Sequence, residues 1–160
     1  MTTQAAQLRR AVVTGAASGI GQATAELLLS RGHSVLATDL RADGLAGLAA
    51  AGARTLSADL STPEGRAALV TAADAFAAEA SAPLDWLVNA AGIIVLKPIG
   101  KVEVADFRLV FATNAESTFF LCQQLGARMM SGGAIVNFSS PSAKFVATTQ
   151  AAVYAAPKAA

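Results

Sequence analysis

The sequence predicts an α/β fold built on a doubly wound parallel sheet, and three observations lead to that prediction. Short apolar runs of strand type alternate along the chain with segments of helical pattern. These runs are continuously apolar, which is typical of parallel strands covered by helices on both faces. A glycine or a polar residue follows each run, and open parallel sheets bind their ligands at the carboxyl ends of the strands.

The first strand–turn–helix unit lies near the N-terminus. A strand over 11–13 leads into the turn TGAASGIG at 14–21, and a helix is expected over about 19–31, with Gly32 as its stop. Glycines at such a turn let the backbone approach a phosphate, and the helix N-terminus presents free N–H groups. The spacing Gly-x3-Gly-x-Gly differs from the general dinucleotide fingerprint, so a tight turn that binds no ligand stays open for this stretch taken alone.

Four further strands and four further helices follow in alternation. Strands are expected at 34–38, 54–58, 84–88 and 134–138. A short helix is expected through 45–49, and longer ones over about 63–80, over 104–130 and from 153 onward. The segment Ser61-Thr62-Pro63-Glu64 has the pattern of a helix start. Right-handed crossovers and a switch point beside the first strand predict the strand order 3-2-1-4-5.

Two aspartates follow the second and third predicted strands. Asp39 comes 18 residues after Gly21, near the ~20 expected of a carboxylate that binds the ribose hydroxyls of a dinucleotide. A carboxylate there repels a 2′-phosphate and so favours NAD over NADP, although the nearby Arg41 keeps NADP open. Asp59 is less specific, and capping the turn before the helix at Pro63 is its alternative role.

Tyr154 and Lys158 are four residues apart at the start of a predicted helix, so they project from one face. A lysine beside a tyrosine stabilises the phenolate, which makes the phenol usable as a general acid or base between an alcohol and a carbonyl. The pattern Tyr-x3-Lys arises often by chance. Here, however, Tyr154 is the only tyrosine, and it follows Ser140 at the end of the fifth predicted strand.

Taken together, these residues make the chain resemble the N-terminal two-thirds of a short-chain dehydrogenase/reductase. The resemblance rests on Thr14-Gly15-x3-Gly19-x-Gly21, Asp59, Asn89-Ala90-Ala91-Gly92, Asn114, Ser140 and Tyr154-x3-Lys158. These residues stand in the family's order and close to its usual separations, and the match spans nearly the whole chain.

The resemblance implies a role for each matched position. Cofactor contacts are implied for Gly15, Ser18, Gly19, Ile20, Gly21, Asp59, Leu60, Asn89, Ala90 and Gly92. Ser140 would hydrogen-bond the substrate oxygen, and Tyr154 would exchange its proton. Lys158 would bind the nicotinamide ribose and tune Tyr154. Asn114 would anchor a water that connects Lys158 to solvent.

Three features depart from the family pattern. Pro157 stands where the family has a small residue, and it is expected in the first helical turn, where it costs no hydrogen bond. Ser140 lies 14 residues before Tyr154, one more than usual, which leaves Ser142 as an alternative for the serine role. Family members are longer, so residues 1–160 are expected to form one dinucleotide-binding domain that is incomplete at its C-terminal end. The strand at 134–138 would then be an exposed edge of the sheet.

Composition and charge exclude several classes of protein. A net charge of +1 without a basic run gives no support for binding to nucleic acid or a membrane surface. No apolar segment approaches the ~18 residues of a membrane helix, and residues 1–7 lack the apolar core of a signal peptide. The single cysteine, Cys122, excludes an internal disulfide and fits a reducing compartment, so a cytoplasmic location is expected. The only histidine, His33, has no ligand cluster at metal spacing, and no metal site is predicted.

The predicted function is that of an NAD-dependent oxidoreductase that acts on a secondary alcohol or the matching ketone. An NADPH-dependent 3-oxoacyl reductase is the alternative within the class, and a non-catalytic dinucleotide-binding regulatory or scaffold protein is the alternative outside it. The resemblance also implies a homo-oligomer, a dimer or tetramer, formed through the helices near 104–130 and after 153. The loop at 93–96, with Phe145 and Val146, predicts an apolar pocket wall but does not identify the substrate.

Overall fold

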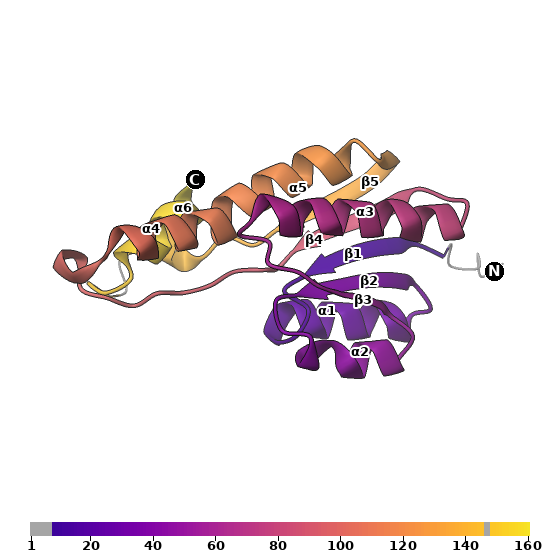
Figure 1. The fold of residues 1–160 in the computed structure, drawn as a ribbon, viewed down its shortest axis with the longest axis horizontal. Helices are drawn as coiled ribbons and strands as arrows, with labels where there is room; N and C mark the ends of the chain where they lie inside the picture. The colour runs from indigo at the N-terminus through magenta and orange to yellow at the C-terminus, as the bar shows by residue number, and fades with distance from the viewer. Residues whose placement is uncertain (1–7, 146–147) are drawn as a thin grey trace, which may run out of the picture.

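A five-stranded parallel sheet forms the centre of the computed structural model, which describes residues 8–145 and 148–160 (Figure 1). The strands are β1 (Arg10–Thr14), β2 (Ser34–Asp39), β3 (Arg54–Ser57), β4 (Leu84–Asn89) and β5 (Met129–Asn137). All four neighbouring pairs are parallel, in the order β3-β2-β1-β4-β5. The predicted fold class and strand order are therefore confirmed. The N-terminal segment 1–7 and Val146 lie outside the described residues.

Helices cover both faces of this sheet. They are α1 (Gly19–Ser30), α2 (Ala46–Ala50), α3 (Pro63–Glu79), α4 (Val104–Phe111), α5 (Ser117–Gly126) and α6 (Ala152–Ala159). Short 3-10 turns are η1 (Asp43–Leu45), η2 (Ile99–Lys101) and η4 (Pro141–Ala143), and a π-helical turn, η3 (Ala112–Glu116), joins α4 to α5. Helices α1 and α2 lie on one side of the sheet, and α3 and α5 lie on the other (Figure 1). In the part of the chain that the structure describes, no helix is long and apolar enough to cross a membrane.

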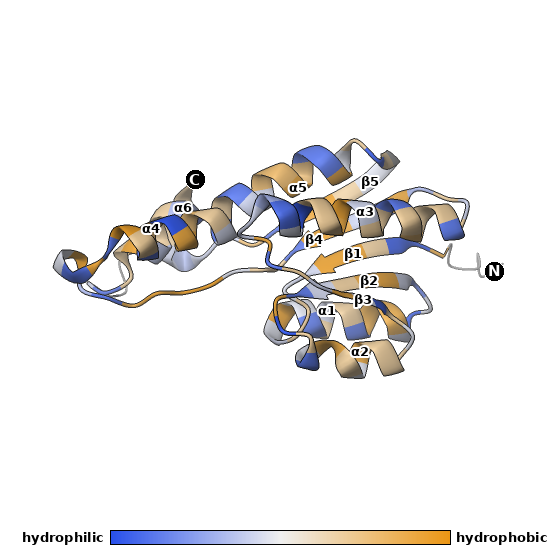
Figure 2. Cartoon of the chain, viewed as in Figure 1, coloured by the Kyte–Doolittle hydropathy of each residue, from blue (hydrophilic) through white to orange (hydrophobic). Residues whose placement is uncertain are grey.

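The central strand β1 shows why the strand runs are apolar without alternation. Ala11 and Val13 belong to the core cluster on the α1–α2 side, whereas Val12 belongs to the cluster on the α3–α5 side. All three side chains are fully buried, and β1 carries apolar colour over most of its arrow in Figure 2. Because successive side chains of a strand point to opposite faces, a strand covered on both faces needs apolar residues at every position.

The start of α3 follows its predicted pattern. Thr62 is extended and precedes the helix, and its hydroxyl accepts a hydrogen bond from the backbone N–H of Gly65 at 3.0 Å. Pro63 occupies the first helical position and Glu64 lies in the first turn. Such a cap satisfies one of the free N–H groups of the helix and contributes about 1 kcal/mol.

The long helix predicted over 104–130 was wrong at its C-terminal end. It contains the π-helical turn η3 and ends at Gly126, and β5 begins at Met129. Met129 pairs with Leu84 of β4, and the register then shifts so that the next pair joins Trp86 to Ala134. Pairing with β4 therefore overrides the helical propensity of this segment, because propensity is weak beside the hydrogen bonds of a sheet edge.

The position of Pro157 was also predicted wrongly. Helix α6 begins at Ala152, so Pro157 is its sixth residue and lies beyond the first turn. Proline has no N–H, and the carbonyl of Val153 therefore receives no hydrogen bond from position 157. Pro157 is buried, which indicates that packing holds it inside the helix.

Strands β3 and β5 form the two edges of the sheet. On β5 the side chains of Ile135 and Val136 are 40% and 45% exposed. The exposed edge that the sequence predicted is thus present in the described structure. An apolar, uncovered edge strand is a template for association with another strand.

Candidate active site

Two adjacent cavities lie where the strands of the sheet end. The first, the acidic cavity, has a volume of about 200 Å³, and its lining includes Gly15, Asp39, Asp59, Leu60, Leu109 and Thr113. The second, the tyrosine cavity, has a volume of about 260 Å³, and its lining includes Ile20, Ala90, Ile94, Ser139, Tyr154 and Lys158. Gly92 and Ile93 line both cavities. Residues at or just after the carboxyl ends of β1 to β4 thus line these two cavities, together with Tyr154 and Lys158 of α6.

The glycine turn between β1 and α1 depends on close backbone approach. Gly15 has a φ of +65°, and a Cβ there would lie 2.7 Å from the carbonyl of Ala90. A Cβ on Gly21 would lie 2.2 Å from the carbonyl oxygen of Gly15. Both glycines are therefore required for packing, so that the turn can lie against the end of β4 and the first turn of α1.

Gly19 differs from the other two glycines of this turn. Its φ is +56°, and apart from its chain neighbours and the backbone of its own helix, no atom lies within 4 Å of the position that a Cβ would take. Ser18, which precedes α1, makes no side-chain cap hydrogen bond within the described structure, and the first turn of α1 contains no acidic residue. The N-terminus of this 12-residue helix is therefore open, with its N–H groups and positive dipole end available to an anion.

Asp39 lies at the end of β2 and contacts the glycine turn. Its Oδ2 accepts a hydrogen bond from the N–H of Ala17, and its Oδ1 accepts one from the N–H of Arg41, both at 3.0 Å. The Asp39 side chain is only 13% exposed, whereas that of Arg41 is 58% exposed, with its Nε 3.9 Å from Oδ1 of Asp39. Asp39 therefore presents an oriented carboxylate in the wall of the acidic cavity.

Asp59 is bonded within its own loop. Its Oδ1 accepts hydrogen bonds from the N–H of Ser61 at 2.9 Å and from the hydroxyl of Ser61 at 2.6 Å. The capping alternative is thus observed, and Asp59 lines the acidic cavity as well. The next residue, Leu60, is buried and supplies an apolar part of the same wall.

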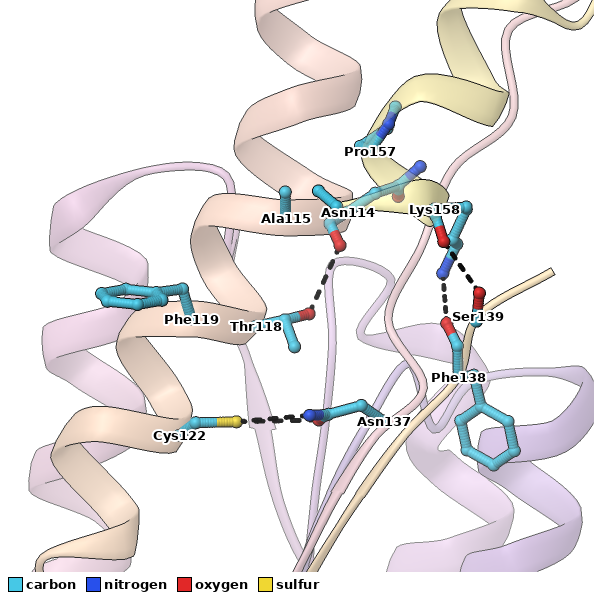
Figure 3. Close-up of a pocket in the computed structure, with 11 residues that line it drawn as sticks. Asn114, Ala115, Thr118, Phe119, Cys122, Asn137, Phe138, Ser139, Pro157 and Lys158 are labelled. Carbon is cyan, nitrogen blue, oxygen red and sulfur yellow. Dashed lines mark hydrogen bonds between the residues drawn. The ribbon is translucent and has the colours of Figure 1, made fainter. Parts of the chain in front are cut away.

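Tyr154 and Lys158 both line the tyrosine cavity from α6. The Nζ of Lys158 donates a hydrogen bond to the carbonyl of Phe138 at 2.8 Å, and the hydroxyl of Ser139 donates to the carbonyl of Lys158 at 2.8 Å (Figure 3). These two bonds attach α6 to the end of β5. Burial lowers the pKa of Lys158 below its usual range, because partial removal from water disfavours the ammonium form.

Ser140 is placed differently from its neighbour Ser139. Of the two, only Ser139 is among the lining residues of the tyrosine cavity. The Oγ of Ser140 accepts a hydrogen bond from the N–H of Ser142 at 3.2 Å and caps η4. A hydroxyl that accepts one hydrogen bond can still donate its own proton, so Ser140 keeps that capacity.

Asn114 lies in the π-helical turn and is 6% exposed. Its Oδ1 accepts a hydrogen bond from the N–H of Ile93, and its Nδ2 donates one to the carbonyl of Ile93, both at 2.8 Å. A Cβ on Gly92 would lie 3.3 Å from Oδ1 of Asn114 and 3.7 Å from Nζ of Lys158. Asn114 thus holds the loop after β4 and, with Lys158, flanks Gly92. π-helical turns occur frequently at functional sites.

Asn89 joins two strands and lines neither cavity among the described residues. Its Nδ2 donates to Oδ1 of Asn137, its register partner on β5, at 2.8 Å, and lies 3.4 Å from Sγ of Cys122. Figure 3 shows the contact between Cys122 and Asn137. Asn137 was not predicted as a site residue, although a polar residue inside an apolar strand run could have signalled it.

Comparisons with known proteins show which family this chain resembles. A family model described as short chain dehydrogenase matches residues 9–160. D-threitol dehydrogenase from Mycolicibacterium smegmatis is 42% identical over 157 residues, a match that covers 92% of this chain and 58% of that protein. The chain therefore spans less than two-thirds of the length of that relative.

Solved structures show the same relationship. Landomycin C-6 ketoreductase with bound NADP and rabelomycin has a TM-score of 0.87 and 32% identity, over 94% of this chain and 65% of that one. A 4-hydroxyisoleucine dehydrogenase complexed with NADH has a TM-score of 0.83 and 28% identity, over 94% of this chain and 62% of that one.

Proposed function

The chain belongs to the short-chain dehydrogenase family, and on that premise we propose that it interconverts a secondary alcohol and a ketone with a nicotinamide cofactor. The observation that carries this proposal is the arrangement of the two cavities. One contains two carboxylates, Asp39 and Asp59, the other contains Tyr154 and Lys158, and Gly92 and Ile93 line both. A dinucleotide needs two such adjoining compartments, with the reacting ring in the second.

The residues present fit a nicotinamide dinucleotide. The open space at Gly19 and the uncapped start of α1 suit a pyrophosphate. Asp39 would accept hydrogen bonds from the adenosine ribose, and Asp59 with Leu60 would hold the adenine. When bound, the cofactor supplies the hydride transfer, and the protein supplies orientation and a route for the proton.

We assign the transfer of the proton to and from the substrate oxygen to Tyr154. Its phenol would give a proton to the substrate oxygen during reduction and take one during oxidation. Lys158 is fixed by the carbonyl of Phe138 and would stabilise the phenolate through its charge. Ser140, whose hydroxyl keeps its capacity to donate, would donate a hydrogen bond to the substrate oxygen.

NAD is the proposed cofactor, and Asp39 supports this choice. Its carboxylate is oriented by two backbone N–H groups, so a 2′-phosphate placed beside it would be repelled. The alternative, an NADPH-dependent 3-oxoacyl reductase, is favoured by the exposed Arg41 and by the NADP found in the landomycin C-6 ketoreductase structure. Titration of the protein with NADH and with NADPH separates the two, and a strong preference for NADPH would remove the role given to Asp39.

A screen of NAD reduction against polyols, sugars, steroids and hydroxy acids tests the function as a whole. We expect turnover of at least one class of secondary alcohol. The protein could instead be a non-catalytic dinucleotide-binding regulator or scaffold. Binding of NADH together with no turnover on any panel member, in either direction, would favour that alternative.

We further propose that the protein is a cytoplasmic homo-oligomer assembled through α4 and α5. Phe107 stacks on Phe111 with ring centroids 4.3 Å apart, and Phe107 and Phe119 are 48% and 64% exposed. Aromatic side chains exposed along a helix are typical of subunit contacts. Sedimentation velocity checks the assembly state, and a monomer at micromolar concentration would contradict it. The cytoplasm is proposed because the single cysteine fits a reducing compartment.

A further inference from the structure

Two walls of the acidic cavity come from segments that lie far apart in the chain. One wall is the loop between β3 and α3, which contributes Asp59, Leu60 and Ser61. The other wall is the helical segment of α4 and η3, which contributes Leu109 and Thr113. The separation of these walls determines what the cavity can hold, so a residue that contacts both segments controls its shape.

Arg66 has the unusual environment that such a role requires. It lies in the first turn of α3, and only 5% of its surface is exposed. A positive charge is disfavoured at the N-terminus of a helix, and burial of a guanidinium carries a desolvation penalty. Its position therefore depends on specific compensating contacts.

Those contacts join the two walls. The Nη1 of Arg66 donates to the carbonyl of Leu60 at 3.1 Å and to that of Ser61 at 3.2 Å. Its Nη2 donates to Oε1 of Glu116, the last residue of η3, at 2.7 Å. The guanidinium also lies over the ring of Phe120, 5.4 Å from its centroid. We propose that Arg66 is a positioning residue that fixes the two walls of the acidic cavity and thereby sets the affinity for the adenosine half of the dinucleotide.

This proposal rests on the proposed function, and it predicts which half of the site responds. Asn114 lies in the same π-helical turn as Glu116 but is held by its own two bonds to Ile93. The tyrosine cavity therefore keeps an independent attachment when the contact between Arg66 and Glu116 is lost. Loss of the contact should therefore lower the affinity for the cofactor and leave turnover at saturating cofactor nearly unchanged.

The test is calorimetric titration with ADP-ribose, which carries the adenosine half without the reacting ring. Arg66→Met keeps an apolar stem of similar length but removes all three hydrogen bonds, and we expect the Kd for ADP-ribose to rise about tenfold. Arg66→Lys keeps the charge without the planar fork and should restore only part of the affinity. With saturating NADH, kcat of Arg66→Met should stay within about twofold of the wild type, because no group that meets the substrate has changed.

Arg54→Met is the matched control. Arg54 pairs with Glu79 of α3 at 2.6 Å, but at the opposite end of that helix and half-exposed. Its loss should leave the Kd for ADP-ribose unchanged. An equal rise in Kd for both variants would mean that general loosening of α3 is responsible, and it would overturn the proposal.

The remaining outcomes are distinct. If the wild-type protein does not bind ADP-ribose, the proposed function itself fails. If the wild type binds and folded Arg66→Met binds equally well, the function stands and the role of Arg66 is rejected. Should Arg66→Met not fold, Glu116→Ala removes the contact between the walls at a half-exposed residue, and we expect an increase of about threefold in Kd. An unchanged Kd for folded Glu116→Ala would likewise reject the proposal.

Discussion

The acidic cavity and the tyrosine cavity share two wall residues but are built in different ways. Each carboxylate of the acidic cavity accepts a hydrogen bond from a residue two positions later in the chain, Ser61 for Asp59 and Arg41 for Asp39, and Asp39 also has a distant donor, Ala17, 22 residues away. Two polar groups of the tyrosine cavity are held by distant parts of the chain. Lys158 donates to a carbonyl 20 residues away, and the hydroxyl of Ser139 donates to a carbonyl 19 residues away.

Because the two cavities are held by different contacts, we expect that substitutions can impair cofactor binding without impairing proton transfer, and the reverse. Changes at the start of α6 should affect turnover without changing cofactor affinity. Substitutions in the glycine turn or at the end of β2 should change the affinity for the cofactor more than they change turnover. The following predictions test that separation, beginning with the largest expected effect.

Tyr154→Phe should abolish turnover and leave cofactor binding intact. The substitution removes only the hydroxyl, and loss of a general acid or base costs about 10²–10⁴-fold in kcat. Steady-state kinetics measures the loss, and the Kd for NADH in the same variant is the control, with a change of less than about twofold expected. Turnover close to that of the wild type would show that Tyr154 is not the proton donor.

Gly15→Ala should weaken cofactor binding at the acidic cavity and also lower the stability of the protein. The residue has φ +65°, and a Cβ would lie 2.7 Å from backbone atoms of Ala90, so we expect a loss of about 2–4 kcal/mol. Thermal unfolding and the Kd for NADH measure it. Gly47→Ala is the control, because α2 has open space at that position and the change should be neutral or slightly stabilising. If both variants behaved alike, the packing argument for Gly15 would be wrong.

Asp39→Ser should change cofactor choice without abolishing activity. It removes the charge that would repel a 2′-phosphate and leaves Arg41 free to attract one. The ratio of the Kd values for NADPH and NADH should fall by about tenfold, which corresponds to about 1.4 kcal/mol. Fluorescence titration with both cofactors provides the measurement, and a ratio that does not move would leave Asp39 with only its contacts to the glycine turn.

Asp85→Asn should lower stability at neutral pH and leave both cavities unaffected. Burial raises the pKa of Asp85, but hydrogen bonds from Arg9 and Arg10 and their charges outweigh burial and hold the pKa below its usual value. Asp85 therefore contributes stability above the pKa of the unfolded chain, and this contribution is lost as the pH falls through the lower pKa of the folded state.

We expect the Asp85→Asn variant to lose about 1–2 kcal/mol at pH 7, and the difference from the wild type to shrink below about pH 4. Urea unfolding at several pH values checks this expectation. A difference that stayed constant down to pH 3 would contradict it, as would a change in the Kd for NADH.

Much of the fold could be predicted because it depends on neighbours in the chain. The apolar run of β1, the cap at Thr62 and the spacing of Tyr154 and Lys158 are local patterns, and each element was found where it was expected. The end of the long helix could not be predicted in this way. Whether residues 127–130 continue the helix or join the sheet depends on an available partner, and Leu84 of β4 supplies it.

The residues of the candidate site can be grouped in the same way, into those that local sequence indicates and those that depend on contacts between distant parts of the chain. Asp39 and the glycines of the first turn were identified from spacing alone, since the strand end brings them together. Arg66 was missed, because nothing local distinguishes a buried arginine from an exposed one. Asn137 was missed as well, although its place inside an apolar strand run is a local signal. Ser139 and Ser140 are neighbours, and only the path of the chain after β5 decides which of them lines the tyrosine cavity.

The sequence by itself determined the parallel sheet, its strand order, the glycine turn and the pairing of Tyr154 with Lys158 on one helix face. The sheet, the turn and the helix pair follow from periodicity and turn chemistry, which act over a few residues, and the strand order follows from the right-handed crossovers of parallel strands. Only the tertiary structure decided that Lys158 is held by the carbonyl of Phe138, and that Arg66 bridges the walls of the acidic cavity. A buried polar group must take whichever partner packing brings to it, and that partner can lie anywhere in the chain.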